Sequence, residues 1–157
     1  MIEFNDFIAG FGLYAGTFIF CFLSGFIPIF NAEAWLVAVS AISPLHVAIP
    51  LIILSALGQM AAKILVFLAG RSGRKIPAGK YKDKIEQTRE KFERWRGRSD
   101  LFVFISASTG FPPFYVISFL VGVLEFSLLR FAFVGLAGRL LRFGVFVYFP
   151  QLFKIWF

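Results

Sequence analysis

The chain consists of long apolar stretches separated by short interruptions that are rich in proline, glycine or charge. A helix needs about 20 consecutive apolar residues to cross the hydrocarbon layer of a bilayer. Residues 45–70 and 126–149 are long enough for that, whereas residues 32–42 are too short. The pattern therefore predicts helices of two kinds, long membrane spans and short apolar arms.

Two apolar stretches, 7–42 and 101–125, are broken by glycine and proline. Proline ends a helix because it lacks a backbone N–H donor and its ring clashes with the preceding turn. The first break is followed by a short arm at 32–42, and the second break separates two arms of about ten residues each. Each break therefore predicts a re-entrant hairpin, in which the chain enters the membrane and returns. The residues at the two breaks are Gly25, Pro28, Gly110, Pro112 and Pro113.

The two breaks resemble each other. Gly25-Phe26-Ile27-Pro28 aligns with Gly110-Phe111-Pro112-Pro113 at an offset of 85 residues, and one long apolar span follows each break. The first half delivers the chain to the segment 71–100, and the second half starts from it. Repeats connected in this way are inverted in the membrane, which is a recurrent plan in transporters.

We therefore predict an all-α integral membrane fold of two inverted repeats, each a re-entrant helical hairpin followed by a transmembrane helix. The composition agrees, since 59% of the residues are hydrophobic and 23 are Phe, against roughly 45–50% apolar residues in soluble domains. The single membrane domain is expected to comprise a first repeat at 7–70, a basic cytoplasmic linker helix at 71–100 and a second repeat at 101–150.

Charge is concentrated in one segment. Residues 71–98 hold eleven Lys and Arg against four Asp and Glu. A short basic loop between apolar segments marks the cytoplasmic side of a membrane protein, and this interpretation is favoured over nucleic-acid binding. We expect a multi-pass protein of a bacterial or archaeal inner membrane, with residues 71–100 in the cytoplasm and no nucleic-acid partner.

Apolar residues inside the basic segment recur at helical spacing. Tyr81, Ile85, Thr88, Phe92 and Trp95 are separated by 4, 3, 4 and 3 positions, which predicts an amphipathic helix. Such a helix can lie on the inner leaflet with its Lys and Arg facing anionic head groups. In the alternative, its apolar stripe packs on the transmembrane helices of the protein itself.

Glu33 is the first candidate for chemistry, because a carboxylate in an apolar segment costs about 2.5–3.5 kcal/mol at the centre of a membrane helix. In the functional interpretation it exchanges protons or orients a head group. In the alternative, it is a charge at the N-terminus of a helix that begins at Ala32, where the helix dipole stabilises it. Asn31 and Tyr115 lie at the two hairpin tips and are expected to line the same cavity.

Three cations lie within the apolar spans. Lys63 is the natural counter-charge for Glu33, with Gln59 one turn away, although its side chain can also reach towards the inner interface. Arg139 and Arg142 are three positions apart on one helix face, where a guanidinium suits phosphate or pairs with a carboxylate. The alternative for both arginines is again an interfacial position.

The motif residues resemble those of one family. Pro28-Ile-Phe-Asn-Ala-Glu33 is similar to the proline-to-glutamate signature of the DedA family, and Gly110 to Gly122 resembles its second hairpin. The last span is similar through Arg130-Phe131 and Gly138-Arg139. The pattern also resembles the eukaryotic VTT-domain, or SNARE-associated Golgi protein-like, proteins.

The resemblance implies two re-entrant hairpins and lipid translocation. DedA members are associated with undecaprenyl phosphate recycling, phospholipid movement and proton-dependent membrane homeostasis, and VTT relatives with phospholipid scrambling. The sequence departs from the family at two places. Phe114, Tyr115 and Val116 stand where many members carry an arginine, and Ala32 replaces a frequent glycine.

We therefore expect a flippase or scramblase that is proton-coupled and moves a phospholipid or polyprenyl-phosphate head group. A secondary transporter of a small anion or drug is one alternative, and a non-transporting membrane adaptor acting through residues 80–98 is another. No nucleophile beside a base, glycine-rich phosphate loop or His/Cys metal spacing can be found, so neither an enzyme nor a cofactor or metal is expected. Gly12 and Gly16 are spaced for close helix contact and are compatible with a homodimer.

Overall fold

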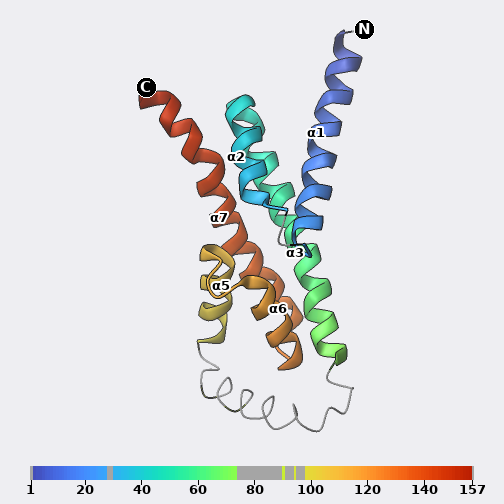
Figure 1. Cartoon of the computed structure of the whole chain (residues 1–157), viewed down its shortest axis with the longest axis vertical. Helices are drawn as coiled ribbons and strands as arrows, with labels where there is room; N and C mark the ends of the chain where they lie inside the picture. The colour runs from blue at the N-terminus through green and yellow to red at the C-terminus, as the bar shows by residue number, and fades with distance from the viewer. Residues whose placement is uncertain (1, 28–29, 74–89, 91–93, 95–97, 157) are drawn as a thin grey trace. The chain divides into compact units, whose positions relative to one another are not determined.

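In the computed structural model, the described residues are 2–27, 30–73, 90, 94 and 98–156. All regular elements in this part of the chain are helical (Figure 1), which confirms the all-α prediction there. Pro28 and most of the predicted linker helix lie outside the described residues. The elements are α1 (Ile2–Ser24), α2 (Ala32–Ile42), the 3-10 turn η1 (Leu45–Val47), α3 (Ala48–Gly73), α5 (Ser99–Thr109), α6 (Phe114–Val123) and α7 (Leu128–Trp156).

Two of the helical segments are long and apolar enough to cross a membrane. They are Leu45–Gly73, with a mean hydropathy of 2.1, and Leu128–Pro150, with a mean hydropathy of 1.5. Their positions agree with the two predicted spans. Pro50 is tolerated inside α3 because it lies in the first turn, where the backbone N–H groups have no partner within the helix.

The chain divides into two compact units. The first comprises Met1–Ala62 and Leu140–Phe157, and the second comprises Lys63–Arg139. Both boundaries fall within long helices, α3 and α7. Each unit therefore contains one helix pair, α1 with α2 or α5 with α6, together with parts of both long helices.

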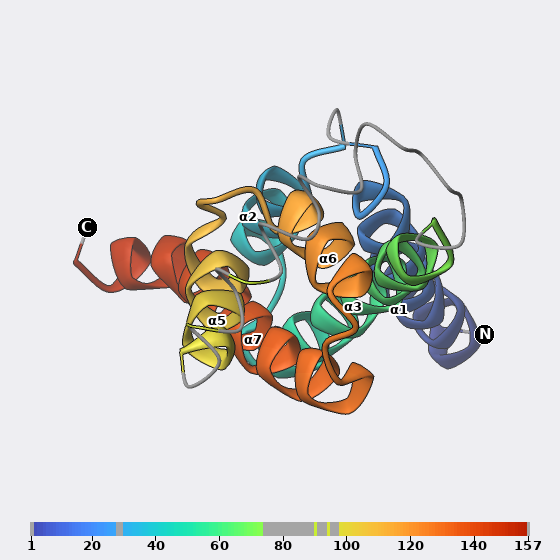
Figure 2. The ribbon, with the colours of Figure 1, turned by 90° about the horizontal axis from the view of Figure 1, so that it is seen from below.

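In the first unit, α1 packs on α2 through aromatic and polar contacts. The indole of Trp35 stacks on the ring of Phe20 with centroids 4.7 Å apart, and its Nε1 donates to Thr17 Oγ1 at 3.3 Å. Where α1 crosses α3 (Figures 1 and 2), Gly58 allows the two backbones to approach, since a Cβ there would lie 2.6 Å from Phe18 O. Small residues thus set the helix spacing, as is common in lipid.

In the second unit, α6 packs against the end of α3 through reciprocal glycine contacts. A Cβ on Gly70 of α3 would clash with the backbone of Phe119, and one on Gly122 of α6 would clash with the backbone of Phe67. The rings of Phe67 and Phe131 stack with centroids 4.9 Å apart. Within this unit, α3 therefore packs against both α6 and α7.

At the break between α5 and α6, nearby side chains form hydrogen bonds with backbone groups that have no partner within a helix. Gly110 ends α5 in the left-handed region at φ 80°, which glycine adopts without a Cβ penalty. Ser106 Oγ donates to Pro112 O at 2.6 Å, and Thr109 Oγ1 accepts from the Phe111 N–H at 3.1 Å. Backbone groups freed at a helix break need such partners wherever they are shielded from water.

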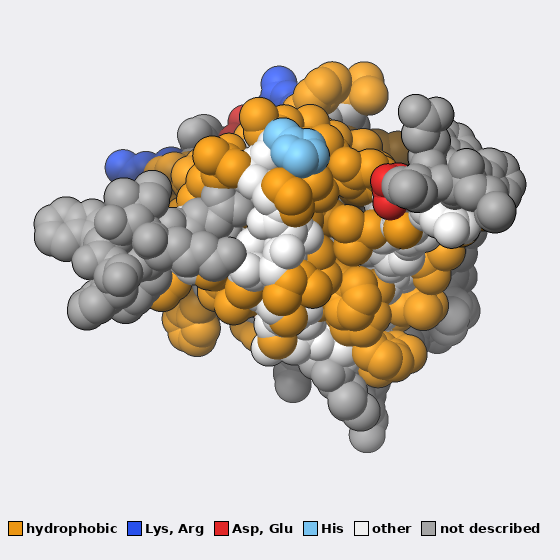
Figure 3. Space-filling model, turned by 90° about the horizontal axis from the view of Figure 1, so that it is seen from above, with side chains coloured by type: hydrophobic (Ala, Val, Ile, Leu, Met, Phe, Trp, Pro, Cys, Tyr) orange, Lys and Arg blue, Asp and Glu red, His pale blue; other side chains and the backbone are white. Residues whose placement is uncertain are grey.

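Large apolar side chains remain on the outer surface. Ile42 is 87% exposed, Phe133 71% and Leu129 70%. Figure 3 shows apolar side chains over most of the described surface on one face, with few charges among them. Exposed apolar area of this extent fits contact with lipid tails better than contact with water.

Candidate functional site

The N-terminus of α2 places Glu33. The side chain of Asn31 caps this helix, because its Oδ1 accepts from the Ala34 N–H at 3.1 Å. Asn31 has extended backbone at φ −85° and ψ 100°, which is the usual conformation of an N-cap residue. Glu33 is therefore held as the second residue of α2, at its electropositive end.

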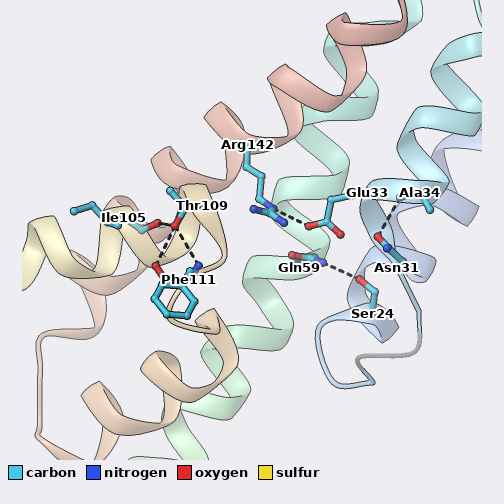
Figure 4. A network of polar contacts seen from close by, with 9 residues as sticks. All are labelled: Ser24, Asn31, Glu33, Ala34, Gln59, Ile105, Thr109, Phe111 and Arg142. Carbon is cyan, nitrogen blue, oxygen red and sulfur yellow. Dashed lines mark hydrogen bonds and ion pairs between the residues drawn. The ribbon is translucent and has the colours of Figure 1, made fainter.

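Arg142 of α7 pairs with Glu33. Its Nε donates to Glu33 Oε1 at 2.7 Å, and the two side chains are only 19% and 20% exposed. The guanidinium also lies over the ring of Phe146, 5.4 Å from the centroid. Figure 4 shows Arg142 reaching from α7 to the start of α2, where Glu33 points back towards it.

An open pocket of about 480 Å³ surrounds this ion pair. Asn31 and Glu33 at the start of α2 and Arg142 of α7 supply the polar lining, and the other residues of α2 together with Phe146 supply the apolar lining. Such a surface can hold a charged group beside a hydrocarbon. The lining residues are Asn31, Glu33, Ala34, Val37, Ala38, Arg142 and Phe146.

Gln59 lies in the same unit but makes a different contact. Its Nε2 donates to Ser24 Oγ at 2.9 Å, and Ser24 Oγ donates to Cys21 O at 2.7 Å. Gln59 is 5% exposed, and its Oε1 has no hydrogen-bond partner among the described residues. Gln59 therefore links α3 to the end of α1, beside the first hairpin break at Gly25, and does not bond to Glu33.

The second unit holds two further predicted cations. Lys63 Nζ lies 5.3 Å from the centroid of the Tyr115 ring, and the Arg139 guanidinium lies 4.8 Å from that of Phe114. Both cations are at least nine-tenths buried. Their aromatic partners are the first two residues of α6, directly after Pro113, so the second break also has cations at its helix start.

The match to known proteins covers this whole arrangement. Residues 27–152 match the family model of the VTT domain. The chain belongs to the VTT-domain family. The match spans α2 to α7 and confirms the resemblance inferred from the proline and glycine motifs. As a member of a membrane-protein family with two apolar helices long enough to span, this VTT-domain protein is a membrane protein.

A search of curated proteins and a search of solved structures each found no match to this VTT-domain protein.

Some pocket residues are not marked by any pattern in the sequence. Ala34 and Ala38 are small residues one turn apart on α2, and Phe146 is one turn beyond Arg142 on α7. Both spacings of four were visible in the sequence. Nearly every residue around them is also apolar. These positions therefore do not differ from their neighbours in the sequence in a way that would identify them as lining a pocket of the VTT domain.

Proposed function

We propose that this protein moves the head group of a phospholipid or polyprenyl phosphate across the membrane through its re-entrant hairpins. The observation that carries the proposal is the Glu33–Arg142 ion pair, which lines a pocket of about 480 Å³ in a unit built mainly of apolar residues. Charged groups within membrane helices are rare and commonly mark a transport path.

The chemistry of the pocket suits a phosphate attached to hydrocarbon. A guanidinium offers several donors to phosphate oxygens, and the N-terminus of α2 adds a positive dipole end. Val37, Ala38 and Phe146 provide an apolar wall beside these groups. The same pocket therefore accommodates both the head group and the start of its tail.

Matching positions in the two halves support an inverted repeat. Glu33 and Tyr115 are each the second residue of their helix, α2 and α6. The cations that contact them, Arg142 and Lys63, are the fifteenth residue of α7 and the sixteenth residue of α3. Each hairpin thus receives a cation from the long helix of the other half.

The test is lipid translocation in proteoliposomes. Fluorescent phosphatidylglycerol and a fluorescent polyprenyl phosphate are followed by quenching of the outer leaflet, with wild type, Glu33→Gln and Arg142→Gln. We expect Arg142→Gln to be at least about tenfold slower, since losing a charge-assisted contact to the phosphate costs about 1.5–3 kcal/mol. Glu33→Gln should be slower as well, because the pocket loses one member of its ion pair. Glu125→Gln, which removes a carboxylate on an exposed turn outside the pocket, should retain the wild-type rate.

Equal rates for all four proteins would show that the pocket does not serve translocation. Failure of the wild type to move either lipid, together with accumulation of a soluble anion in the vesicles, would favour the secondary transporter instead.

A further inference from the structure

We propose that Glu33 occupies the place on Arg142 that the phosphate of the ligand takes, so that it acts as an internal competitor that keeps binding weak and reversible. This inference rests on the proposed function of the pocket. It concerns how the ligand is admitted and released, and it assigns to Glu33 a role opposite to that of a binding residue.

The contact itself is of the kind that a phosphate would make. A carboxylate and a phosphate both present anionic oxygens to a guanidinium at about 2.7–2.9 Å, and Arg142 Nε lies 2.7 Å from Glu33 Oε1. The two side chains are the charged residues that line the pocket. A phosphate that takes the Nε donor of Arg142 must therefore replace the carboxylate.

The charge of the pocket leads to the same conclusion. Glu33 and Arg142 together are neutral, so an arriving phosphate meets no net attraction from the pair. Without the carboxylate, the residues that line the pocket carry one positive charge, that of Arg142, beside the start of α2, where the helix dipole also favours an anion. Removal of the negative charge at residue 33 should therefore raise the affinity for phosphate.

Displacement of Glu33 does not require α2 to unwind. Asn31 holds the start of this helix through its bond to the Ala34 N–H, independently of the ion pair. The displaced carboxylate stays at the second position of α2, next to the same dipole. The exchange is thus a side-chain movement. When the carboxylate returns to Arg142, it expels the ligand. A transport site needs such release, because a tightly bound ligand would not leave it.

The experiment compares binding with translocation in the full-length protein. Dihexanoyl phosphatidic acid, a short-chain phosphate lipid, is titrated into detergent-solubilised protein by calorimetry. The proteins are wild type, Glu33→Gln, Arg142→Gln, Glu33→Gln with Arg142→Gln, and Glu125→Gln as the control for net charge. Glu33→Gln should bind about five- to tenfold more tightly than wild type, as expected for loss of a partly exposed competing charge.

The gain should disappear in the double variant, since it depends on Arg142, and Glu125→Gln should bind as wild type does. Glu33→Gln should also translocate lipid more slowly although it binds more tightly. A purely structural role for Glu33 would lower binding and transport together, so this opposite change separates the two roles.

Three outcomes overturn the inference. If the wild type translocates lipid but Glu33→Gln binds no more tightly, Glu33 is not a competitor, and the proposed function stands. If the double variant keeps the full gain, Arg142 is not the group that Glu33 occupies. If neither wild type nor Glu33→Gln binds the lipid and no lipid is translocated, the proposed function fails together with the inference.

Discussion

Asn31 and Glu33 are two positions apart in the sequence, but their side chains make different contacts. Asn31 ends the preceding loop and supplies a hydrogen-bond acceptor to the first turn of α2. Glu33 turns towards α7 and pairs with Arg142. The cap fixes where the helix begins, and that start in turn fixes the direction in which Glu33 points. At this scale, the geometry of the pocket depends on a residue that carries no charge.

Asn31→Ala should lower the stability of the protein by about 1 kcal/mol, the usual cost of losing an N-cap. Asn31→Ser should lose much less, because a serine hydroxyl also accepts from the first turn. Thermal unfolding in detergent, followed by circular dichroism, measures both. Equal destabilisation by the two substitutions would show that the hydrogen bond accepted from the Ala34 N–H is not what stabilises the start of α2.

At the scale of elements, glycines decide how closely the helices pack. Gly70 and Gly122 face backbone of the opposite helix, and an added Cβ would clash there. A Cβ on Gly12, Gly16 or Gly144 would meet no atom within 4 Å. The first pair therefore fixes the spacing of α3 and α6, whereas the homodimer expected from Gly12 and Gly16 stays a prediction.

Gly122→Ala should destabilise the protein by about 1–3 kcal/mol, the range for overpacking a well-packed contact. Gly144→Ala, inside α7, should be neutral or stabilising by up to about 1 kcal/mol, because alanine is the better helix former. Unfolding midpoints of the two variants measured in the same detergent check this. A stability loss of equal size in both would contradict the assignment of Gly122 to a helix contact.

For the whole molecule, the orientation in the membrane follows from the basic segment. If residues 71–100 are cytoplasmic and α3 spans the membrane, the two ends of α3 lie on opposite sides. His46, just before α3, and Ser72, in its last turn, are both exposed. Positive charge flanking one end of a span keeps that end inside.

In a Cys21→Ala background, a membrane-impermeant maleimide added to intact spheroplasts should label His46→Cys. It should reach Ser72→Cys only after the membrane is permeabilised. The extent of labelling is read on a gel by mass shift. Labelling of Ser72→Cys in intact spheroplasts would reverse the predicted orientation, and labelling of both positions there would show that α3 does not span.

Much of the chain could be derived from local sequence. The 11-residue helix Ala32–Ile42 agrees with the predicted range, and α5 and α6 end and begin around Gly110 and Pro113. Proline and glycine act on the backbone within a few residues, so their effects can be read directly. Hydropathy and the clustered Lys and Arg likewise indicated a membrane protein without any knowledge of packing.

The partner of Glu33 could not be derived in that way. Lys63, Arg139 and Arg142 were all candidate partners by sequence, because each is a cation within an apolar span. Arg142 lies 109 residues from Glu33 along the chain, and no local rule relates two positions so far apart. Only the packing of α2 beside α7 brings these side chains to 2.7 Å, and the same packing forms the pocket around them.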